Sequence, residues 1–183
     1  LGSGNLGTAL TTGTDNVAIG EASLDAVTTG SDNTAVGDNA GGALTTGGNN
    51  VAIGSGALLV ATTAADNTAI GTLALTANTS GTDNTAVGYA AGDAVTTGSD
   101  NTLIGDNAGG ALTTGDFNTA IGSGALITQT TASYNTAVGY LSLTANTTGN
   151  ANVGLGESTL AANTTGSNNS ALGYNVLAAN TTG

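Results

Sequence analysis

The sequence contains no cysteine, proline, methionine, tryptophan, lysine, arginine or histidine. Without cysteine the chain has no disulfide, no thiolate chemistry and no cysteine-based zinc site. Without histidine, cysteine or lysine, few groups remain for acid–base or nucleophilic catalysis. We therefore expect a protein that is not an enzyme. We assign no catalytic, cofactor-binding or metal-binding residue, and no cofactor.

Positive charge is absent, while 12 acidic residues give a formal net charge of −12. A nucleic-acid partner is not expected, because binding to the phosphate backbone requires Lys or Arg. The same reasoning argues against attachment to anionic lipid. No apolar run approaches the roughly 20 residues that span a bilayer. We therefore expect no membrane insertion by this segment, and the chain carries no recognisable signal peptide.

Charged residues are scarce, at 7% of the chain, against about a quarter in typical globular proteins. Yet 39% of the residues are hydrophobic, which is more than disordered segments usually contain. The low complexity of the sequence therefore does not indicate disorder, and the spacing of the apolar residues decides its fold.

A period of 17 residues runs through the chain. Asn recurs at every seventeenth residue from Asn16 to Asn169, and Gly follows four residues after each Asn. Counted from the residue before the Asn, the repeat reads D/N-N-T/V-A-V/I/L-G-x-x-A/S-L/G-x-A-x-T-T-G-x. We number these repeat positions 1 to 17.

The domain organisation follows from this period. Residues 1–14 form a partial repeat, and residues 15–183 form ten repeats, the last one residue short. Residues 32–48 match residues 100–116 at 14 of 17 positions, so four repeats of 17 residues make a 68-residue super-repeat. The pattern has no polar caps, which solenoids normally require, so we expect a part of a longer fibre.

The repeat predicts an all-β, parallel β-solenoid of ten 17-residue coils. Seventeen residues are too few for a helix pair, and the Gly residues disfavour a single helix. Val, Ile and Thr favour strands. We expect one strand at positions 3–5 and a second at positions 9–13. Coils stacked at about 4.8 Å would make a rod about 48 Å long.

Alternation along the first strand separates position 4 from positions 3 and 5. We expect the branched apolar residue at position 5 to face the core, opposite Leu at position 10. Position 4 would then face outward, and its small apolar side chains predict self-association with other copies of the chain. This column contains Ala18, Ala35, Ala52, Ala69, Ala86, Ala120, Ala137 and Ala171.

The Asn column at position 2 predicts a stacked ladder of side-chain amides. Asn also tolerates left-handed turn geometry. The Gly at position 6 is expected to take a positive φ or to permit close backbone approach.

Two tracts resemble a known type of repeat. Residues 135–149 resemble the NTAxGYxxLxxNTTG repeats of bacteriophage tail fibres and bacterial surface proteins, and residues 15–20 resemble the head repeats of YadA-like trimeric autotransporter adhesins. The resemblance implies a left-handed β-roll, a homotrimeric rod and an extracellular location on a cell-surface appendage or virion tail fibre. Adhesin head repeats are typically shorter, which leaves the cross-section of the coil open.

Several candidate binding features recur with the repeat. The acidic residues at position 1 offer oxygen ligands for Ca²⁺, but the GGxGxD signature of calcium β-rolls is absent and a solvated turn is the simpler interpretation. The Thr-Thr pairs form a ladder that suggests ice binding, although a turn is the simpler interpretation. Asn-x-Thr/Ser sequons occur at Asn78, Asn146, Asn163, Asn168 and Asn180. Phe117 and the four tyrosines Tyr89, Tyr134, Tyr140 and Tyr174 could contact sugars.

These observations favour a structural or adhesive fibre shaft that holds a distal binding tip away from its anchor. The first alternative is a glycan- or receptor-binding module that contacts a host surface through its turns. The second alternative is an ice-binding solenoid.

Overall fold

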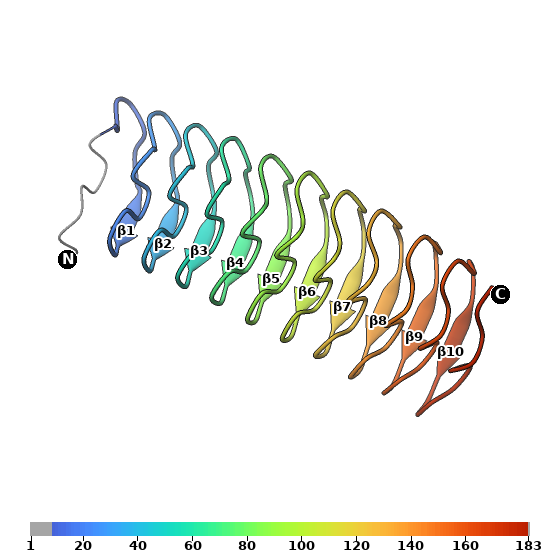
Figure 1. The fold of residues 1–183 in the computed structure, drawn as a ribbon. Coiled ribbons are helices and arrows are strands. Elements are labelled where there is room, and N and C mark those ends of the chain that lie inside the picture. Colours follow the sequence, from blue (N-terminus) through green and yellow to red (C-terminus); the bar gives the residue numbers. More distant parts are fainter. Residues whose placement is uncertain (1–8, 183) are drawn as a thin grey trace.

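The computed structural model describes residues 9–182, which form a rod of stacked coils (Figure 1). Each coil contributes one short strand, and the ten strands form a single sheet in chain order. Part of the predicted partial repeat, residues 1–8, lies outside the described residues, as does residue 183. The strands are β1 (Val17–Ile19), β2 (Thr34–Val36), β3 (Val51–Ile53), β4 (Thr68–Ile70), β5 (Thr85–Val87), β6 (Thr102–Ile104), β7 (Thr119–Ile121), β8 (Thr136–Val138), β9 (Val153–Leu155) and β10 (Ser170–Leu172).

The strands pair in parallel with a constant register of one repeat. Val17 lies beside Thr34, and Ile19 lies beside Val36. The Val17 N–H donates to the Asn33 carbonyl at 2.8 Å, and the Gly37 N–H donates to the Ile19 carbonyl at 2.7 Å. The predicted parallel β-solenoid of 17-residue coils is therefore confirmed. No helix among the described residues has the length and apolar character needed to cross a bilayer.

The second strand predicted at positions 9–13 is wrong, because this half of the coil is a run of turns. Ala22 and Leu24 have φ of 51° and 49°, in the left-handed region. The Leu24 N–H donates to the Ala40 carbonyl of the next coil at 3.1 Å, whereas the Val27 N–H donates back to the Leu24 carbonyl at 3.3 Å. Bonds between coils thus alternate with bonds within a coil, and no extended strand forms.

The predicted faces of the first strand are also reversed. In the Ala column, Ala35, Ala69 and Ala120 are fully buried inside the single chain. The branched residues point outward, with Ile19 46% exposed. The physical reason is the narrow interior: Leu at position 10 already occupies it, so the strand opposite has room only for a small side chain. The Ala column, including Ala18, Ala52, Ala86, Ala137 and Ala171, is therefore core or packs against it and is not an interface between chains.

Leu103 is the exception that explains this packing. It replaces Ala at position 4 and is fully buried. The two position 10 residues nearest to it are Gly92 and Gly109. A Cβ on Gly92 would lie 2.5 Å from Leu103 Cδ1, and one on Gly109 would lie 2.7 Å from Leu103 Cδ2. Leu103 thus fills the space that a Leu at position 10 would occupy in the coils where that position is Gly. The core keeps its packing density.

The predicted Asn ladder is confirmed. The Asn50 backbone N–H and side-chain Nδ2 both donate to Oδ1 of Asn33, each at 3.0 Å. The same Nδ2 donates to the Ala64 carbonyl at 2.9 Å. The Asn backbone itself is not left-handed; position 1 takes that conformation, with φ of 59° at Asp32. Within residues 9–182, every buried side-chain polar atom has a hydrogen-bond partner.

The Gly at position 6 behaves as predicted, with φ between 126° and 140° in all ten coils. A Cβ on Gly88 would overlap the carbonyl group of Gly105 in the next coil. Glycine is therefore required here both by conformation and by close stacking.

Candidate functional site

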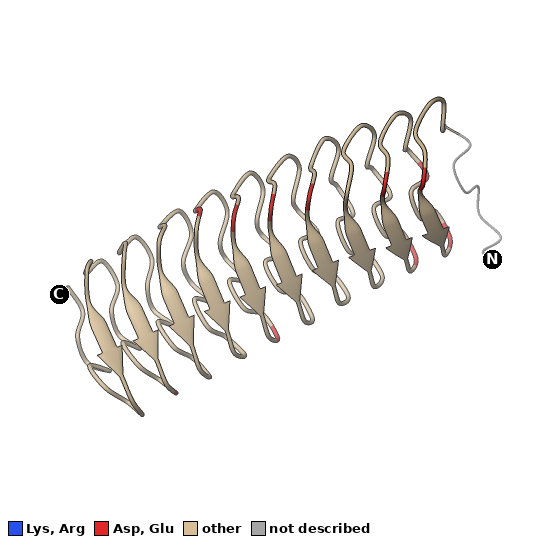
Figure 2. Cartoon of the chain, turned by 180° about the vertical axis from the view of Figure 1, so that it is seen from behind, with Lys and Arg blue, Asp and Glu red and all other residues tan. Residues whose placement is uncertain are grey.

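The outer surface of the ten strands runs along the rod. We call it the strand face and define it as repeat positions 3 and 5. It carries Thr, Val or Ser at position 3 and Ile, Val or Leu at position 5, with no charged residue in any coil. Figure 2 shows acidic residues at the turns that flank the strands and none on a strand. Ile53 and Ile70 are each 37% exposed, and Leu172 is 76% exposed.

The turn before each strand carries the acidic column at position 1. Asp66, Asp83 and Asp100 occupy it in the middle coils, and all three have positive φ. Among residues 9–182, no group of three or more acidic side chains lies close enough to hold a metal ion. The geometry therefore adds no support for the calcium hypothesis.

In two coils the same column carries aromatic residues instead. Phe117 and Tyr134 stack with ring centroids 5.2 Å apart and an interplanar angle of 9°. They are 50% and 62% exposed. Each ring covers one face of the other. The two aromatic side chains therefore stack at the same repeat position in adjacent coils, as the Asn side chains do at position 2.

The turn after each strand carries a second mixed column at position 7. It contains acidic, hydroxyl-bearing and aromatic residues, all of them exposed. Tyr89 is 58% exposed, Tyr140 is 53% exposed and Tyr174 is 74% exposed. The full column is Glu21, Asp38, Ser55, Thr72, Tyr89, Asp106, Ser123, Tyr140, Glu157 and Tyr174.

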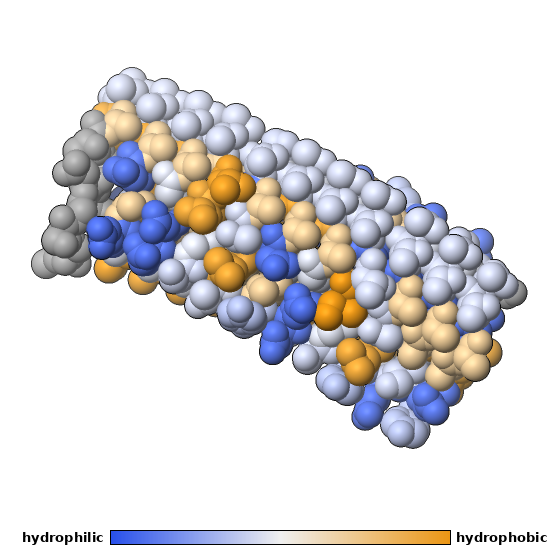
Figure 3. Space-filling model, viewed as in Figure 1, coloured by the Kyte–Doolittle hydropathy of each residue, from blue (hydrophilic) through white to orange (hydrophobic). Residues whose placement is uncertain are grey.

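The Thr-Thr pairs form turns, as their simpler interpretation predicts. The N–H groups of Thr28, Thr29 and Gly30 all point to the Thr45 carbonyl, at 3.0, 3.3 and 3.4 Å. The Thr28 hydroxyl donates to the same carbonyl at 3.1 Å. Weakly polar rows run along the upper edge of the rod in Figure 3. The first Thr hydroxyl of other pairs donates in the same way, as in Thr45 and Thr113, which weakens the case for an ice-binding array.

The sequons differ in accessibility. Asn78, Asn146 and Asn163 are fully buried, and Asn78 Nδ2 donates to the Gly81 carbonyl at 3.1 Å. A glycan has no access to these three side chains. Asn168 is exposed on a turn, and Asn180 is half-buried.

One carboxyl group has a perturbed environment. Partial burial raises the pKa of Asp93 above its usual value, and hydrogen bonds to the backbone N–H groups of Asp93 and Ala94 oppose part of this effect. Asp93 stands at position 11 in the run of turns, away from the other acidic columns.

Compared with models of known protein families, with curated proteins and with solved structures, the chain has no significant match. The class that the structure itself defines is a parallel β-solenoid with stacked Asn ladders.

Proposed function

We propose that this chain is a shaft segment of an extracellular fibre, on a bacterial surface or a phage tail, that holds a distal binding tip away from its anchor. It acts through its shape and not as an enzyme. The unbroken hydrogen-bonded register across ten coils supports this proposal. So does the complete pairing of buried polar side chains within residues 9–182, because a half-satisfied polar core would weaken the rod.

The observation that carries the proposal is the uncharged strand face. A chain of net charge −12 repels its own copies unless the contact surface excludes carboxylates. The strand face meets this condition over the whole rod and exposes branched apolar side chains such as Ile70. We infer that copies of the chain associate through this face, which takes over the role expected of the Ala column.

Three copies are the expected number, because the repeat resembles those of phage tail fibres and YadA-like adhesins. Two features of this chain agree with a packed strand face: it is regular in every coil, and its side chains are short. The same resemblance carries the extracellular location and the adhesive role. Both remain part of the proposal.

The mass of the native particle in solution tests this function, measured by light scattering after size exclusion. We expect three chains in a thin rod. Ile70→Asp combined with Ile121→Asp places charge on the strand face and should give monomers with an unchanged circular dichroism spectrum. Thr97→Asp, at an exposed residue outside the strand face, is the control and should leave the mass unchanged. A wild-type monomer at about 100 µM, a concentration well above the Kd of a stable assembly, would exclude the self-association.

A glycan-binding role is the second candidate function. The exposed aromatic residues of the two turn columns favour it, since such side chains are frequent in binding surfaces. A glycan array probed with this segment alone tests the glycan-binding role, because a segment that acts only as a shaft binds nothing on the array.

A further inference from the structure

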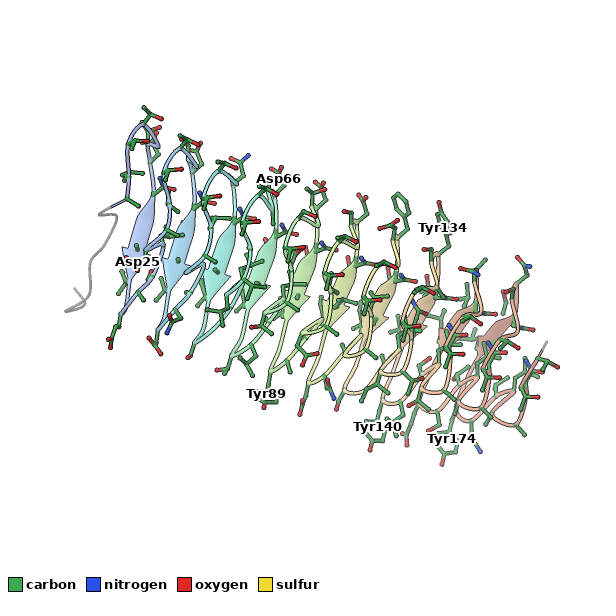
Figure 4. All side chains as sticks on the ribbon, turned by 45° about the horizontal axis from the view of Figure 1, so that its top comes forward. Asp25, Asp66, Tyr89, Tyr134, Tyr140 and Tyr174 are labelled. Carbon is green, nitrogen blue, oxygen red and sulfur yellow. The ribbon has the colours of Figure 1, made fainter. Side chains whose placement is uncertain are left out.

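Three residues of the position 7 column form a constellation that no other coil repeats. Tyr140, Glu157 and Tyr174 occupy the same turn in three successive coils. The Ser158 N–H donates to the Tyr140 carbonyl, and the Asn175 N–H donates to the Glu157 carbonyl, each at 2.9 Å. These bonds fix the order and the spacing of the three residues. Figure 4 shows Tyr140 and Tyr174 projecting from the same edge of the rod.

The spacing leaves both rings available. Phe117 and Tyr134 lie on adjacent coils and cover one another at 5.2 Å. Tyr140 and Tyr174 lie two coils apart, about 9.6 Å at a strand spacing of about 4.8 Å. Neither ring is therefore covered by the other, and Glu157 occupies the same position in the coil between them.

We propose that Tyr140, Glu157 and Tyr174 form a binding subsite for a neutral oligosaccharide. Aromatic rings supply large, rigid apolar surfaces, on which the C–H face of a pyranose ring can pack. The Glu157 carboxylate accepts hydrogen bonds from sugar hydroxyl groups. The two rings contact successive sugar units, while the carboxylate fixes their orientation.

The charge of the rod selects the class of sugar. The chain has no Lys or Arg and a net charge of −12, so uronate-containing, sialylated and sulfated glycans are repelled. The subsite does not rest on the proposed shaft. Position 7 lies outside the strand face. The subsite is tested by measuring oligosaccharide binding, whereas the shaft is tested by measuring the mass of the particle, so the two proposals can fail separately.

The affinity of one subsite is low, with a Kd of about 1 mM, because the residues form an open surface and not an enclosing pocket. Binding to a polymer then depends on several copies of the chain acting together. This is the behaviour expected of an adhesive fibre.

Saturation-transfer NMR with cellohexaose and chitohexaose measures the binding, with oligogalacturonate as the acidic control. Tyr140→Ser and Tyr174→Ser are mild substitutions, because Ser55 and Ser123 occupy the same position in other coils. Each should weaken binding about tenfold, and Glu157→Gln should weaken it less. Tyr89→Ser is the matched control: Tyr89 has Thr72 and Asp106 beside it and no second tyrosine two coils away. It should leave the affinity unchanged.

A gain of function completes the test. Ser123→Tyr rebuilds the same spacing around Asp106, together with Tyr89. In the Tyr140→Ser background it should restore binding of the neutral hexasaccharides. Three results would overturn the subsite: no neutral oligomer binds at about 10 mM, Tyr89→Ser weakens binding as much as Tyr140→Ser, or oligogalacturonate binds best.

Discussion

At the scale of single residues, the direction of the strand side chains decides what the core contains. Leu103 faces inward and is fully buried, while its neighbour Ile104 faces outward and is partly exposed. The two residues are adjacent and nearly equal in size, so they form a natural pair for mutation.

Leu103→Ala should destabilise the fold by about 2–5 kcal/mol, because it removes buried contacts and leaves a cavity beside Gly92 and Gly109. Ile104→Ala should cost about 1 kcal/mol or less in the monomer, since the side chain is already in contact with water. Urea denaturation followed by circular dichroism, at concentrations where the chain is monomeric, measures both. A larger cost for Ile104→Ala would reverse the assignment of the two faces.

Asp93 gives a pH-dependent prediction. Its pKa is raised in the folded chain, because burial disfavours the charged carboxylate. The folded state therefore binds more protons than the unfolded state near this pKa, and Asp93 lowers stability as the pH rises through it.

Asp93→Asn should consequently raise the melting temperature at about pH 7 and leave it nearly unchanged at about pH 3, where both states are protonated. Asp25→Asn, at the same repeat position in the first coil, is the comparison variant. Thermal melts at the two pH values measure the effect. A greater gain for Asp93→Asn at the acidic pH than at neutral pH would contradict the expected direction of this pH dependence.

At the scale of the coil, the period alone predicts the register, the Asn ladder and the position 6 glycines. It does not predict which face of the strand is inside. A three-residue strand is too short for its alternation to show which face is buried. The buried face depends on the width of the coil, which is determined by tertiary packing. The conformation of the second half is also beyond prediction from the period. Leu24 takes a left-handed conformation that costs an isolated Leu about 1–2 kcal/mol, and stacking against the neighbouring coil supports it through the bond from the Leu24 N–H to the Ala40 carbonyl.

The candidate subsite is predicted in part. The tyrosines are visible in the sequence as possible sugar contacts, and the period places Tyr140 and Tyr174 two repeats apart. Their exposure depends on the shape of the turn, which follows from the run of left-handed residues after position 7. The left-handed residues stand at positions 8 and 10, and the local sequence does not predict them, because Leu, Ala, Asn and Ser take this conformation there as well as Gly.

Coils should be removable as units. Deleting residues 49–65 removes one whole coil and joins equivalent positions of two repeats. The remaining nine coils should stack with a similar circular dichroism spectrum and a slightly lower melting temperature. Deleting residues 50–65 removes one residue fewer and shifts the register at the junction, which turns core side chains outward. That variant should melt at a clearly lower temperature than the variant without residues 49–65, when both are measured by scanning calorimetry. Equal melting temperatures would show that stacking tolerates a change of register.

At the scale of the whole molecule, charge of one sign dominates the electrostatics. The carboxylates recur in columns along the rod, with no cation to balance them. Raising the salt concentration from about 10 mM to about 150 mM shortens the screening length from about 30 Å to about 8 Å. The melting temperature should rise over this range. Asp66→Asn combined with Asp83→Asn should reduce that response, and a salt-independent melting temperature would contradict it.

The hydrogen bonds between coils, such as that from the Val17 N–H to the Asn33 carbonyl, run along the axis of the rod. A pull on its two ends loads successive coils in series, so they detach one after another and do not share the force. Each coil occupies about 4.8 Å when stacked and about 58 Å when its 17 residues are drawn out. A fibre of such coils under tension therefore behaves as an extensible tether, and it lengthens in steps of about 50 Å.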